Sequence, residues 1–500
     1  MQILSREQIQ AWDLYTIQNE PISSIDLMER AATRCFEWIR QQHWQGHSFK
    51  IFCGKGNNGG DGLAIARMLL KSGFSTIIYI LENGKAGSQD FQVNLQRLHD
   101  LTTDIHFLQS EDIFPSFQES DIVIDALFGS GLIKPVSGLA AMLVEYINAS
   151  KATIVSIDVP SGLFMDESSI GSPIIVAHHT LTFGVYKMGL LVQENAPYIG
   201  KVHLLDIGLH QRYLKEHTFH KELTEPALAK SIFKPRKQFA HKGNFGHALL
   251  IAGSYGKIGA ALLATRACMR SGSGLTTVFV PRCGYAILQT AAPEAMVMTD
   301  EKEEHLSSLP GELDKYASIG IGPGIGTEDA TQKIVSFITR RYTKPLVIDA
   351  DALNILSLHK ELLTNIPTDS ILTPHPREFD RLFGDHSNDF ERIRTASAKA
   401  RELKSIIVLK GHHTVIATPG GELFFNNTGN AGMAKGGSGD VLTGILTALK
   451  AQGYESEQAA ILGVYIHGMA GDLAASKYSM EAMMASDIIE CLSIAFPQIY

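Results

Sequence analysis

The feature that most constrains the fold is a repeated alternation of short apolar strands, glycine-rich loops and helices. The first half predicts strands at 49–53, 76–81, 122–126, 153–157, 180–183 and 202–206. The second half predicts them at 248–252, 275–280, 318–321, 346–348, 370–372 and 406–409, with a hairpin over 414–417 and 422–425. Such alternation indicates a largely parallel sheet covered on both faces. It lapses between residues 208 and 242, so we expect two α/β domains with a boundary near 212–225.

Length and composition agree with this division. The 500 residues are too many for one ordinary core. The chain is 45% apolar and 19% charged, as in soluble globular proteins. A net charge of −8 without a long Lys/Arg run argues against nucleic-acid binding. No apolar run reaches the roughly 18–20 residues that cross a bilayer, so no membrane association is expected.

The cysteines and the N-terminus predict a cytoplasmic location. The five cysteines are scattered, odd in number and never in a C-x-x-C pair, which favours reduced thiols and gives no zinc pattern. The first residues lack the basic and apolar regions of a signal peptide. We therefore expect an enzyme of a reducing compartment.

Three polar loops follow three predicted strands of the first half. The loop at 54–62 contains a Gly-x-Gly-x-x-Gly match, which is a weak signal alone. Asp125 begins Asp-Ala-Leu-Phe-Gly-Ser-Gly, and Asp158 begins Asp-Val-Pro-Ser-Gly. Taken singly, each Asn, Asp or Ser beside glycine is equally well explained as a turn residue. Because ligands bind beyond the carboxyl ends of parallel strands, the three loops together favour a site.

The second half contains Gly-Gly-Ser-Gly-Asp at 436–440, followed directly by an apolar helical run. Backbone N–H groups at such a helix start favour a phosphate or a developing anion. Asp440 would repel a phosphate, so it is either a helix cap or a base that deprotonates an attacking hydroxyl. The full glycine loop favours the base. No P-loop motif and no kinase-type glycine loop with His-Arg-Asp occurs in the sequence.

These motifs resemble two known families. The second half resembles the NAD(P)H-hydrate dehydratase branch of the ribokinase-like superfamily. Its matching segments are Gly-Pro-Gly-Ile-Gly at 322–326, Asp-Ala-Asp-Ala-Leu-Asn at 349–354, Thr-Pro-His-Pro-x-Glu at 373–378 and the loop at 436–440. The first half is similar to the NAD(P)H-hydrate epimerase family through 56–62, 125–131 and 158–162. In this order they resemble the bacterial bifunctional NAD(P)H-hydrate repair enzymes over nearly the full length.

The resemblance implies an N-terminal Rossmann-like doubly wound sheet, residues 1–215, and a C-terminal ribokinase-like α/β domain, residues 222–500. It implies that the first interconverts the R and S forms of hydrated NADH and NADPH. The second would dehydrate the S form at the expense of ADP, giving AMP and phosphate. Hydroxide is a poor leaving group, and phosphorylating the hydroxyl on ring carbon 6 makes its elimination feasible. Only these small molecules are expected as partners, and we expect a homo-oligomer.

In the second half the resemblance implies that Asp440 is the catalytic base and that the N–H groups of the preceding glycine loop stabilise the transferring phosphoryl group. The implied nucleotide-binding residues are Lys410, Gly411, His412, His413, Thr414 and Gly439. The hydrated cofactor would contact Ala260, Gly322, His375 and Asp440, and Mg²⁺ would accompany the nucleotide. For His375, a structural role between two prolines is the alternative.

In the first half, Asp158 is the implied general acid/base. The implied substrate-binding residues are Asn57, Asn58, Gly59, Gly60, Asp61, Gly129, Ser130, Gly131, Leu132, Ile133, Lys134, Pro135 and Asp158. A K⁺ site is implied at Asn58, Asp125 and Ser161, which all offer hard oxygen ligands. Lys187 lies in none of these motifs and is interpreted as an ordinary loop residue.

Two alternatives remain. The second half could be a small-molecule kinase of the hydroxymethylpyrimidine or hydroxyethylthiazole type, because both reactions need the same base and anion-binding loop. The first half could be a noncatalytic Rossmann-like binding module, since fold does not fix function. The Thr-Pro-His-Pro segment argues against the first alternative, and the intact Asn58, Asp125, Asp158 and Ser161 argue against the second.

Overall fold

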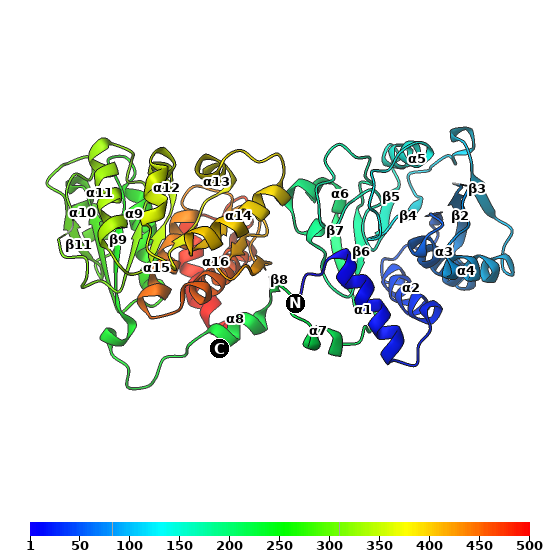
Figure 1. The fold of residues 1–500 in the computed structure, drawn as a ribbon, viewed down its shortest axis with the longest axis horizontal. Coiled ribbons are helices and arrows are strands. Elements are labelled where there is room, and N and C mark those ends of the chain that lie inside the picture. Colours follow the sequence, from blue (N-terminus) through cyan, green and yellow to red (C-terminus); the bar gives the residue numbers. More distant parts are fainter. Residues whose placement is uncertain (83, 310) are drawn as a thin grey trace. The chain divides into compact units, whose positions relative to one another are not determined.

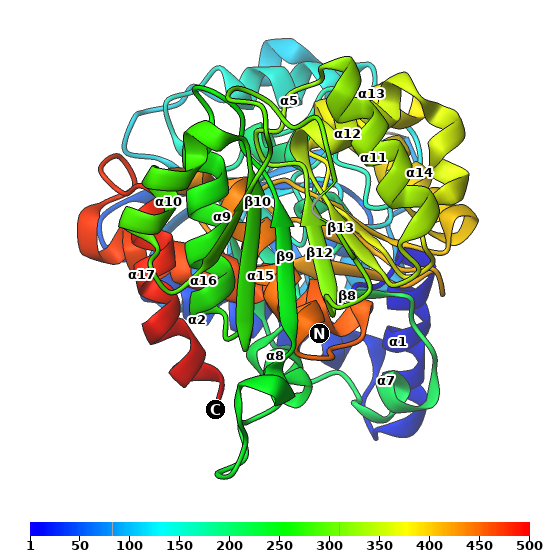
Figure 2. The same cartoon turned by 90° about the vertical axis from the view of Figure 1, so that its left-hand side faces the viewer.

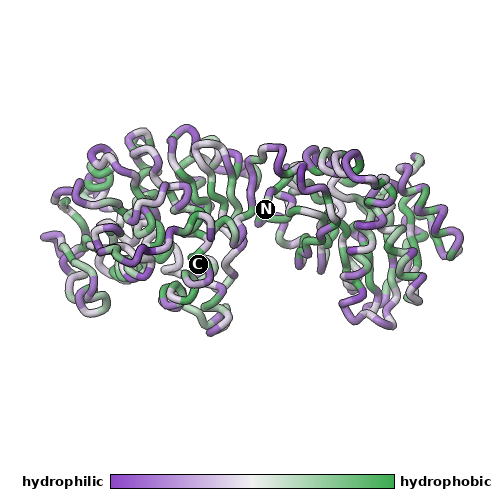
Figure 3. Tube along the Cα trace, turned by 90° about the horizontal axis from the view of Figure 1, so that it is seen from below, coloured by the Kyte–Doolittle hydropathy of each residue, from purple (hydrophilic) through white to green (hydrophobic). Residues whose placement is uncertain are grey.

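The computed structural model describes residues 1–82, 84–309 and 311–500 (Figure 1). It divides the chain into two compact units. The first contains residues 2–219 together with 388–390, and the second contains Met1, 220–387 and 391–500. Each unit has its own sheet and its own hydrophobic core. In each, the hydrophobic segments lie mostly inside and the hydrophilic ones at the periphery (Figure 3).

The first unit is built on a seven-stranded parallel sheet with strand order β3-β2-β1-β4-β5-β6-β7. Its strands are β1 (Ser48–Cys53), β2 (Ser75–Leu81), β3 (Ile105–Leu108), β4 (Ile122–Ala126), β5 (Thr153–Ile157), β6 (His179–Phe183) and β7 (Lys201–Leu205). Its helices are α1 (Arg6–Asn19), α2 (Ser24–Arg40), α3 (Asn57–Lys71), α4 (Gln89–His99), α5 (Leu139–Asn148), α6 (Ala196–Ile199) and α7 (Arg212–Glu216). This order reverses direction between β1 and β4, which is the ligand-binding switch point of Rossmann-like sheets.

Helices cover both faces of this sheet because side chains alternate along each strand. Ile51 of β1 and Ile124 of β4 point to the face covered by α2, α3 and α4. Phe52 and Val123, their neighbours in sequence, point to the other face and pack with α5. The strands are therefore buried on both sides, as their nearly continuous apolar sequences predict.

The second unit has a ten-stranded sheet of order β11-β10-β9-β12-β13-β14-β15-β16-β17-β8. Figure 2 shows its central strands β10, β9, β12 and β13 side by side. All neighbours are parallel except in the β15-β16-β17 segment, where both pairings are antiparallel. Its strands are β8 (Lys221–Thr224), β9 (His247–Ile251), β10 (Leu275–Val280), β11 (Met296–Thr299), β12 (Ser318–Ile321), β13 (Leu346–Ile348), β14 (Ile371–Leu372), β15 (Ile406–Leu409), β16 (Val415–Ala417) and β17 (Leu423–Asn426). Its helices are α8 (Pro226–Ile232), α9 (Ile258–Arg270), α10 (Tyr285–Ala291), α11 (Asp329–Arg341), α12 (Ala350–Leu358), α13 (Pro376–Phe383), α14 (Asp389–Leu403), α15 (Ser438–Ala451), α16 (Ser456–Tyr478) and α17 (Ala485–Ala495).

The central strand β9 shows how this second core is divided. Leu250 packs with α9 and α15 on one face, and Leu249 and Ile251 pack with α11 and α12 on the other. Helix α16 is the one helix of the described chain that is long and apolar enough, by length and composition, to span a membrane. However, 72% of its apolar window is buried inside the structure, as expected for a core helix. The sequence of α16 contains no uninterrupted apolar run of this length, because polar residues such as His467 lie within it.

The α/β fold class and both predicted sheet types are confirmed, with three local corrections. Strands β3, β8 and β11 were not predicted, because β3 and β11 contain exposed positions and β8 lies in a segment that looks like a polar connection. Residues 57–62, expected as a loop, form the first turns of α3 instead. The helix after the second glycine loop likewise begins at Ser438, before the expected Val441. Glycine disfavours helices, so these segments were expected as loops, but close packing at Gly59 and Gly437 places them at helix starts.

Candidate active sites

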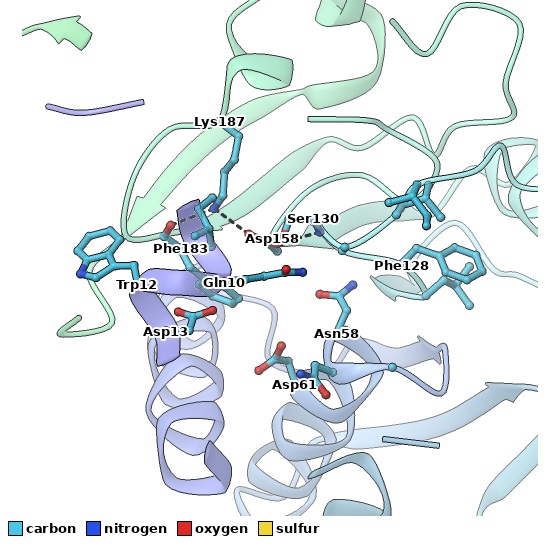
Figure 4. A pocket seen from close by; sticks show the side chains of 18 of the residues that line it. Gln10, Trp12, Asp13, Asn58, Asp61, Phe128, Ser130, Asp158, Phe183 and Lys187 are labelled. Carbon is cyan, nitrogen blue, oxygen red and sulfur yellow. Dashed lines mark hydrogen bonds and ion pairs between the residues drawn. The ribbon is translucent and has the colours of Figure 1, made fainter. Parts of the chain in front are cut away.

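A cavity of about 570 Å³ lies at the switch point of the first unit (Figure 4). Its walls come from α1, from the loop after β1, from the loop after β4 and from the loops after β5 and β6. The volume falls within the range of small-molecule sites. The polar loops that the sequence singled out therefore do meet around one hollow space.

Close backbone approach fixes the shape of the first two loops. A Cβ atom at Gly54 would lie 2.0 Å from the Leu127 carbonyl oxygen, and one at Gly59 would lie 1.7 Å from the Gly54 carbonyl oxygen. Only glycine allows these contacts, because a backbone atom cannot move aside as a side chain can. The glycines at 54 and 59 thus bring the start of α3 against the loop that follows β4.

The charged centre of this cavity is an ion pair between Asp158 and Lys187. The Lys187 ammonium donates to Asp158 Oδ1 at 2.8 Å, to Thr182 Oγ1 at 2.6 Å and to the Phe183 carbonyl at 2.9 Å. The Ser130 N–H donates to Asp158 Oδ2 at 3.1 Å. Burial would raise the pKa of Asp158, but Lys187 and the Ser130 donor outweigh it and hold that pKa below its ordinary value. Asp158 is therefore a carboxylate at neutral pH, and its φ of +67° shows a backbone constrained for this position.

Behind the cavity lies a buried carboxylate, Asp125, held only by neutral donors. It accepts from Ser161 Oγ at 2.5 Å, from the Ser161 N–H at 2.9 Å and from Ser156 Oγ at 2.7 Å. Ser161 Oγ also lies 3.0 Å from the Phe128 carbonyl oxygen. Burial raises the pKa of Asp125, although these hydrogen bonds oppose the shift. The cluster of oxygens around an uncompensated carboxylate has the chemistry of a hard-cation site.

The third residue of the predicted K⁺ site lies close by. Asn58 packs against Gly129, where a Cβ atom would meet its side-chain oxygen at 3.1 Å. Its amide nitrogen is buried and has no hydrogen-bond partner in the described structure. Asn58 thus brings the first turn of α3 against the loop after β4, and its unpaired donor leaves a hydrogen bond for a ligand.

The structure brings together most of the residues predicted to bind substrate in the first unit. The cavity is lined by Asn57, Asn58, Asp61, Gly129, Ser130, Gly131, Leu132, Ile133, Lys134 and Asp158. Gly59 and Gly60 are buried in the first turn of α3, and Pro135 lies beyond the lining. Asp13 and Lys187 also line the cavity and were not predicted. Asp13 is one polar residue within an ordinary helix, and Lys187 lies outside every motif, so neither gave a sequence signal.

In the second unit, the glycine loop turns directly into α15. Gly437 caps the helix with a φ of +94°, and a Cβ atom there would lie 2.6 Å from the Leu263 side chain. Glycine is therefore required at this turn on both counts. The Gly439 N–H falls in the first turn of the helix, where backbone donors can bind an anion, while the Ser438 N–H makes a long hydrogen bond of 3.4 Å to the Lys435 carbonyl oxygen.

Asp349 links this loop to the predicted nucleotide segment. The Lys410 ammonium donates to Asp349 Oδ1 at 2.8 Å, and Thr443 Oγ1 of α15 donates to Asp349 Oδ2 at 2.7 Å. A Cβ atom at Gly439 would lie 3.6 Å from Lys410 Nζ. Lys410, Gly439 and the start of α15 thus lie close together around the Asp349 carboxylate. The sequence did not suggest this role for Asp349.

Asp440 lies in the first turn of α15, and its side chain has no hydrogen bond or ion pair to any residue that the structure describes. Burial raises its pKa, the Asp349 carboxylate raises it further, and Lys410 partly opposes both. The result is a pKa of about 7. A half-ionised carboxyl group without a partner is well suited to exchange protons with a substrate near neutral pH.

The remaining predicted residues surround this centre. Gly322 has a φ of +131°, and a Cβ atom there would lie 1.8 Å from the Asp349 carbonyl oxygen. Ala260 approaches the same loop, 3.2 Å from the Cβ position of Gly324. The side chain of His375 caps α13, accepting through Nδ1 from the N–H groups of residues 377 and 378.

His375 therefore has the structural role that was kept as its alternative, while its other ring nitrogen remains able to bind a ligand. That nitrogen lies 3.5 Å from Glu378, whose carboxylate lies 3.8 Å from Lys410 Nζ. Residues 410–414 form the turn between β15 and β16. In this turn, the Gly411 N–H donates to Thr414 Oγ1 at 3.3 Å, and His412 packs against His413 with ring centroids 4.5 Å apart. Within the described ranges, no three His, Cys, Asp or Glu side chains are grouped to hold a metal ion.

The two sheets with their strand-end sites define a fused α/β enzyme, with a Rossmann-like part and a ribokinase-like part. Family models match both parts. Residues 248–493 match NAD(P)H-hydrate dehydratase, and residues 24–189 match the YjeF-related protein N-terminus.

Whole-length relatives match as well. The chain is 38% identical over 491 residues to the bifunctional NAD(P)H-hydrate repair enzyme Nnr of Moorella thermoacetica, covering 94% of this chain and 92% of the relative. It is 32% identical over 469 residues to the Nnr of Escherichia coli, covering 93% and 88%. The chain belongs to the family of bifunctional NAD(P)H-hydrate repair enzymes.

Among solved structures, the ADP/ATP-dependent NAD(P)H-hydrate dehydratase of Bacillus subtilis, co-crystallised with ATP/Mg²⁺, is similar to the chain. The two are 30% identical, with a TM-score of 0.49. The similarity covers 56% of this chain and 99% of that one.

Proposed function

We propose that this protein repairs hydrated NADH and NADPH by two activities. Residues 1–215 interconvert the R and S epimers, and residues 222–500 dehydrate the S form with ADP, releasing AMP and phosphate. The observation that carries the proposal is the 38% identity to a bifunctional repair enzyme across 94% of the chain. The division of the chain at 219/220 supports the assignment of one activity to each part.

In the dehydratase, Asp440 takes the proton from the hydroxyl on ring carbon 6 as that oxygen attacks the terminal phosphorus of the nucleotide. The N–H groups at the start of α15 stabilise the charge on the transferring phosphoryl group. Phosphate then leaves from carbon 6, and the ring double bond is restored by loss of the proton from carbon 5. The raised pKa of Asp440 supports its role as the base, because a pKa near the working pH gives the most effective proton transfer.

Binding of the nucleotide is assigned to residues 410–414 together with Gly439. Lys410 is already fixed by Asp349 beside the glycine loop, so its ammonium can reach a phosphate without a large rearrangement. Mg²⁺ would enter on the nucleotide phosphates, a mode in which few protein ligands are needed.

In the epimerase, Asp158 is the acid/base and the cavity holds the hydrated nicotinamide ring. Asn58, Asp125 and Ser161 would hold K⁺, which would neutralise the buried Asp125 and stiffen the loops around the substrate. Oxygen-only donors and the missing countercharge support this assignment. A cytoplasmic location is supported by the five cysteines, all of them free, and a homo-oligomer is expected.

The test is to incubate the protein with a mixture of both epimers, Mg²⁺ and either ADP or ATP, and to follow the return of dihydronicotinamide absorbance. Wild type should repair the whole mixture with ADP. Asp158→Ala should repair one epimer rapidly and then enter a slow phase set by spontaneous inversion. Complete single-phase repair by Asp158→Ala would favour a noncatalytic first unit, and accumulation of a stable phosphorylated product would favour a small-molecule kinase.

A further inference from the structure

Two carboxyl groups of the epimerase cavity have no function in the reaction as described above. Asp13 is on α1 and Asp61 is on α3, and both line the cavity (Figure 4). Neither side chain has a hydrogen bond or ion pair to any described residue. Asp158 comes from a different wall, the loop after β5, and is held there by Lys187. Figure 4 shows Asp13 on α1 and Asp61 on α3, both below Asp158 in this view.

Inversion at ring carbon 6 needs proton transfer on both faces of the ring. The hydroxyl leaves from one face as water, which requires an acid. Water then adds to the other face, which requires a base. One fixed carboxylate cannot reach both faces of a ring held in one orientation, so a second group on another wall is needed.

The carboxyl groups have the protonation states that an acid and a base on opposite ring faces require: Asp158 is ionised, and Asp13 can hold a proton. Lys187 keeps Asp158 ionised, with a pKa below the ordinary value despite its burial. Burial, and then the negative charge of Asp158, raise the pKa of Asp13 to about 7, although Lys187 opposes this. Burial, followed by the charges of Asp158 and Asp13, also raises the pKa of Asp61. Groups of one chemical type whose surroundings move their pKa values apart are typical acid–base partners.

The other charged groups that line the cavity are Lys55 and Lys134. Lys55 is ion-paired with Glu82, so it is not a free counterion for Asp13. Asn58 supplies a second, independent sign of a ligand in this space, because its buried amide nitrogen has no partner. The cavity thus offers the substrate a carboxylate from the loop after β5, two protonatable carboxyl groups from α1 and α3, and an unused hydrogen-bond donor from Asn58.

We propose that Asp13, assisted by Asp61, is a second catalytic residue of the epimerase and acts on the ring face opposite to Asp158. This inference rests on the proposed epimerase function. Asp13 gives its proton to the hydroxyl on carbon 6, the C–O bond breaks, and its electron pair leaves with the departing water. The lone pair of the ring nitrogen forms a C=N double bond.

A water molecule then bonds to carbon 6 from the other face and gives a proton to Asp158, while the C=N electron pair returns to nitrogen. One water is lost and one is gained, and the net proton passes from Asp13 to Asp158. In the reverse direction the two residues exchange roles. Asp61 assists because the negative charges of Asp158 and Asp13 disfavour its ionisation, so it adds no further negative charge when Asp13 gives up its proton.

The experiment uses the full-length protein and the pure R epimer without nucleotide, so that the dehydratase is inactive. Formation of the S epimer is followed by chromatography. Asp13→Asn should lower the rate of epimerisation by about 10²–10⁴-fold, the usual effect of losing a positioned acid. Dehydration of pure S epimer with ADP should stay at the wild-type rate, which shows that the substitution affects only the first unit.

The pH profile separates a catalytic role from a structural one. Wild-type epimerisation should fall above about pH 7, where Asp13 loses its proton. The residual activity of Asp13→Asn should lack this alkaline limb, and Asp13→Glu should restore part of the rate together with the limb. Glu7→Gln is the matched control, because it removes a carboxylate from the same helix at a side chain that is 65% exposed and outside the cavity.

The outcomes distinguish this inference from the function on which it rests. If wild type does not interconvert the epimers, the epimerase assignment fails and the inference falls with it. If wild type is active and Asp13→Asn stays within a few-fold of it, or keeps the alkaline limb, then Asp13 is not the acid and the epimerase assignment stands.

Discussion

The dehydratase should lose activity in mild acid because of the surroundings of Asp440. Its pKa of about 7 compares with an ordinary value of 3.8. A base must be ionised to act, and about half of the molecules are ionised at pH 7 but only about 1% at pH 5. The value of kcat/KM for dehydration of the S epimer should therefore fall about fiftyfold between these two pH values. A carboxylate with an ordinary pKa would still be more than about 90% ionised at pH 5, and the rate would hardly change.

The nucleotide phosphates also titrate, with a second pKa of about 6, so a control is needed. Asp349→Asn removes the negative charge that contributes most to the shift after burial, and it keeps an oxygen that can accept from Thr443. If the loss of kcat/KM in acid reflects protonation of Asp440, it should occur at lower pH in this variant. If it reflects protonation of the nucleotide, its pH should not change. A wild-type profile that is flat from pH 5 to pH 7, or a limb that Asp349→Asn does not move, would refute the reasoning.

Three further results are expected. Asp440→Asn should keep ADP binding, measured by calorimetry, and lose dehydration by about 10²–10⁴-fold; turnover within a few-fold of wild type would make Asp440 only a helix cap. Gly411→Val should raise the ADP concentration needed for half-maximal rate without unfolding the protein, since its Cβ position is open, whereas Gly322→Ala should lower the melting temperature because its Cβ would meet a backbone carbonyl at 1.8 Å. Fragments 1–219 and 220–500 should fold separately, the first epimerising without nucleotide and the second repairing only one epimer; a fragment 1–219 that folds, binds substrate and does not epimerise would contradict this division.

Much of the fold could be predicted because buried parallel strands give nearly continuous apolar sequences. The predicted bounds of β4, β5, β10, β12 and β13 agree with the structure to the residue. The edge strand β3 could not be recognised, since His106 and Phe107 are exposed and its four residues lack a clear pattern. Strand β8 is hidden for a different reason: its pairing partner is far away in sequence and its own residues look like a polar connection.

Some residues of the candidate sites could likewise be predicted from the sequence, and others could not. Asp125, Asp158 and Asp440 were predicted because each accompanies a glycine loop, and glycine patterns report close backbone approach. Their chemical roles stay predictions until the variants are measured. Asp13, Lys187 and Asp349 bring charges into these sites through tertiary contacts alone. Asp349 lay inside a recognised motif, but nothing in the sequence indicates that it pairs with Lys410.

The parallel pairing of β8 with β17 has a consequence for synthesis of the chain. Lys221 pairs with Leu423, so β8 cannot pair until β17 has been synthesised, about 200 residues later. At translation rates of about 5–20 residues per second, that wait lasts roughly 10–40 s. During this time residues 2–219 are already outside the ribosome and can complete their own sheet, while β8 is an unpaired strand on a nascent chain. The ribosome-bound intermediate is therefore the stage at which chaperones and strand-exchange errors have the greatest opportunity to act.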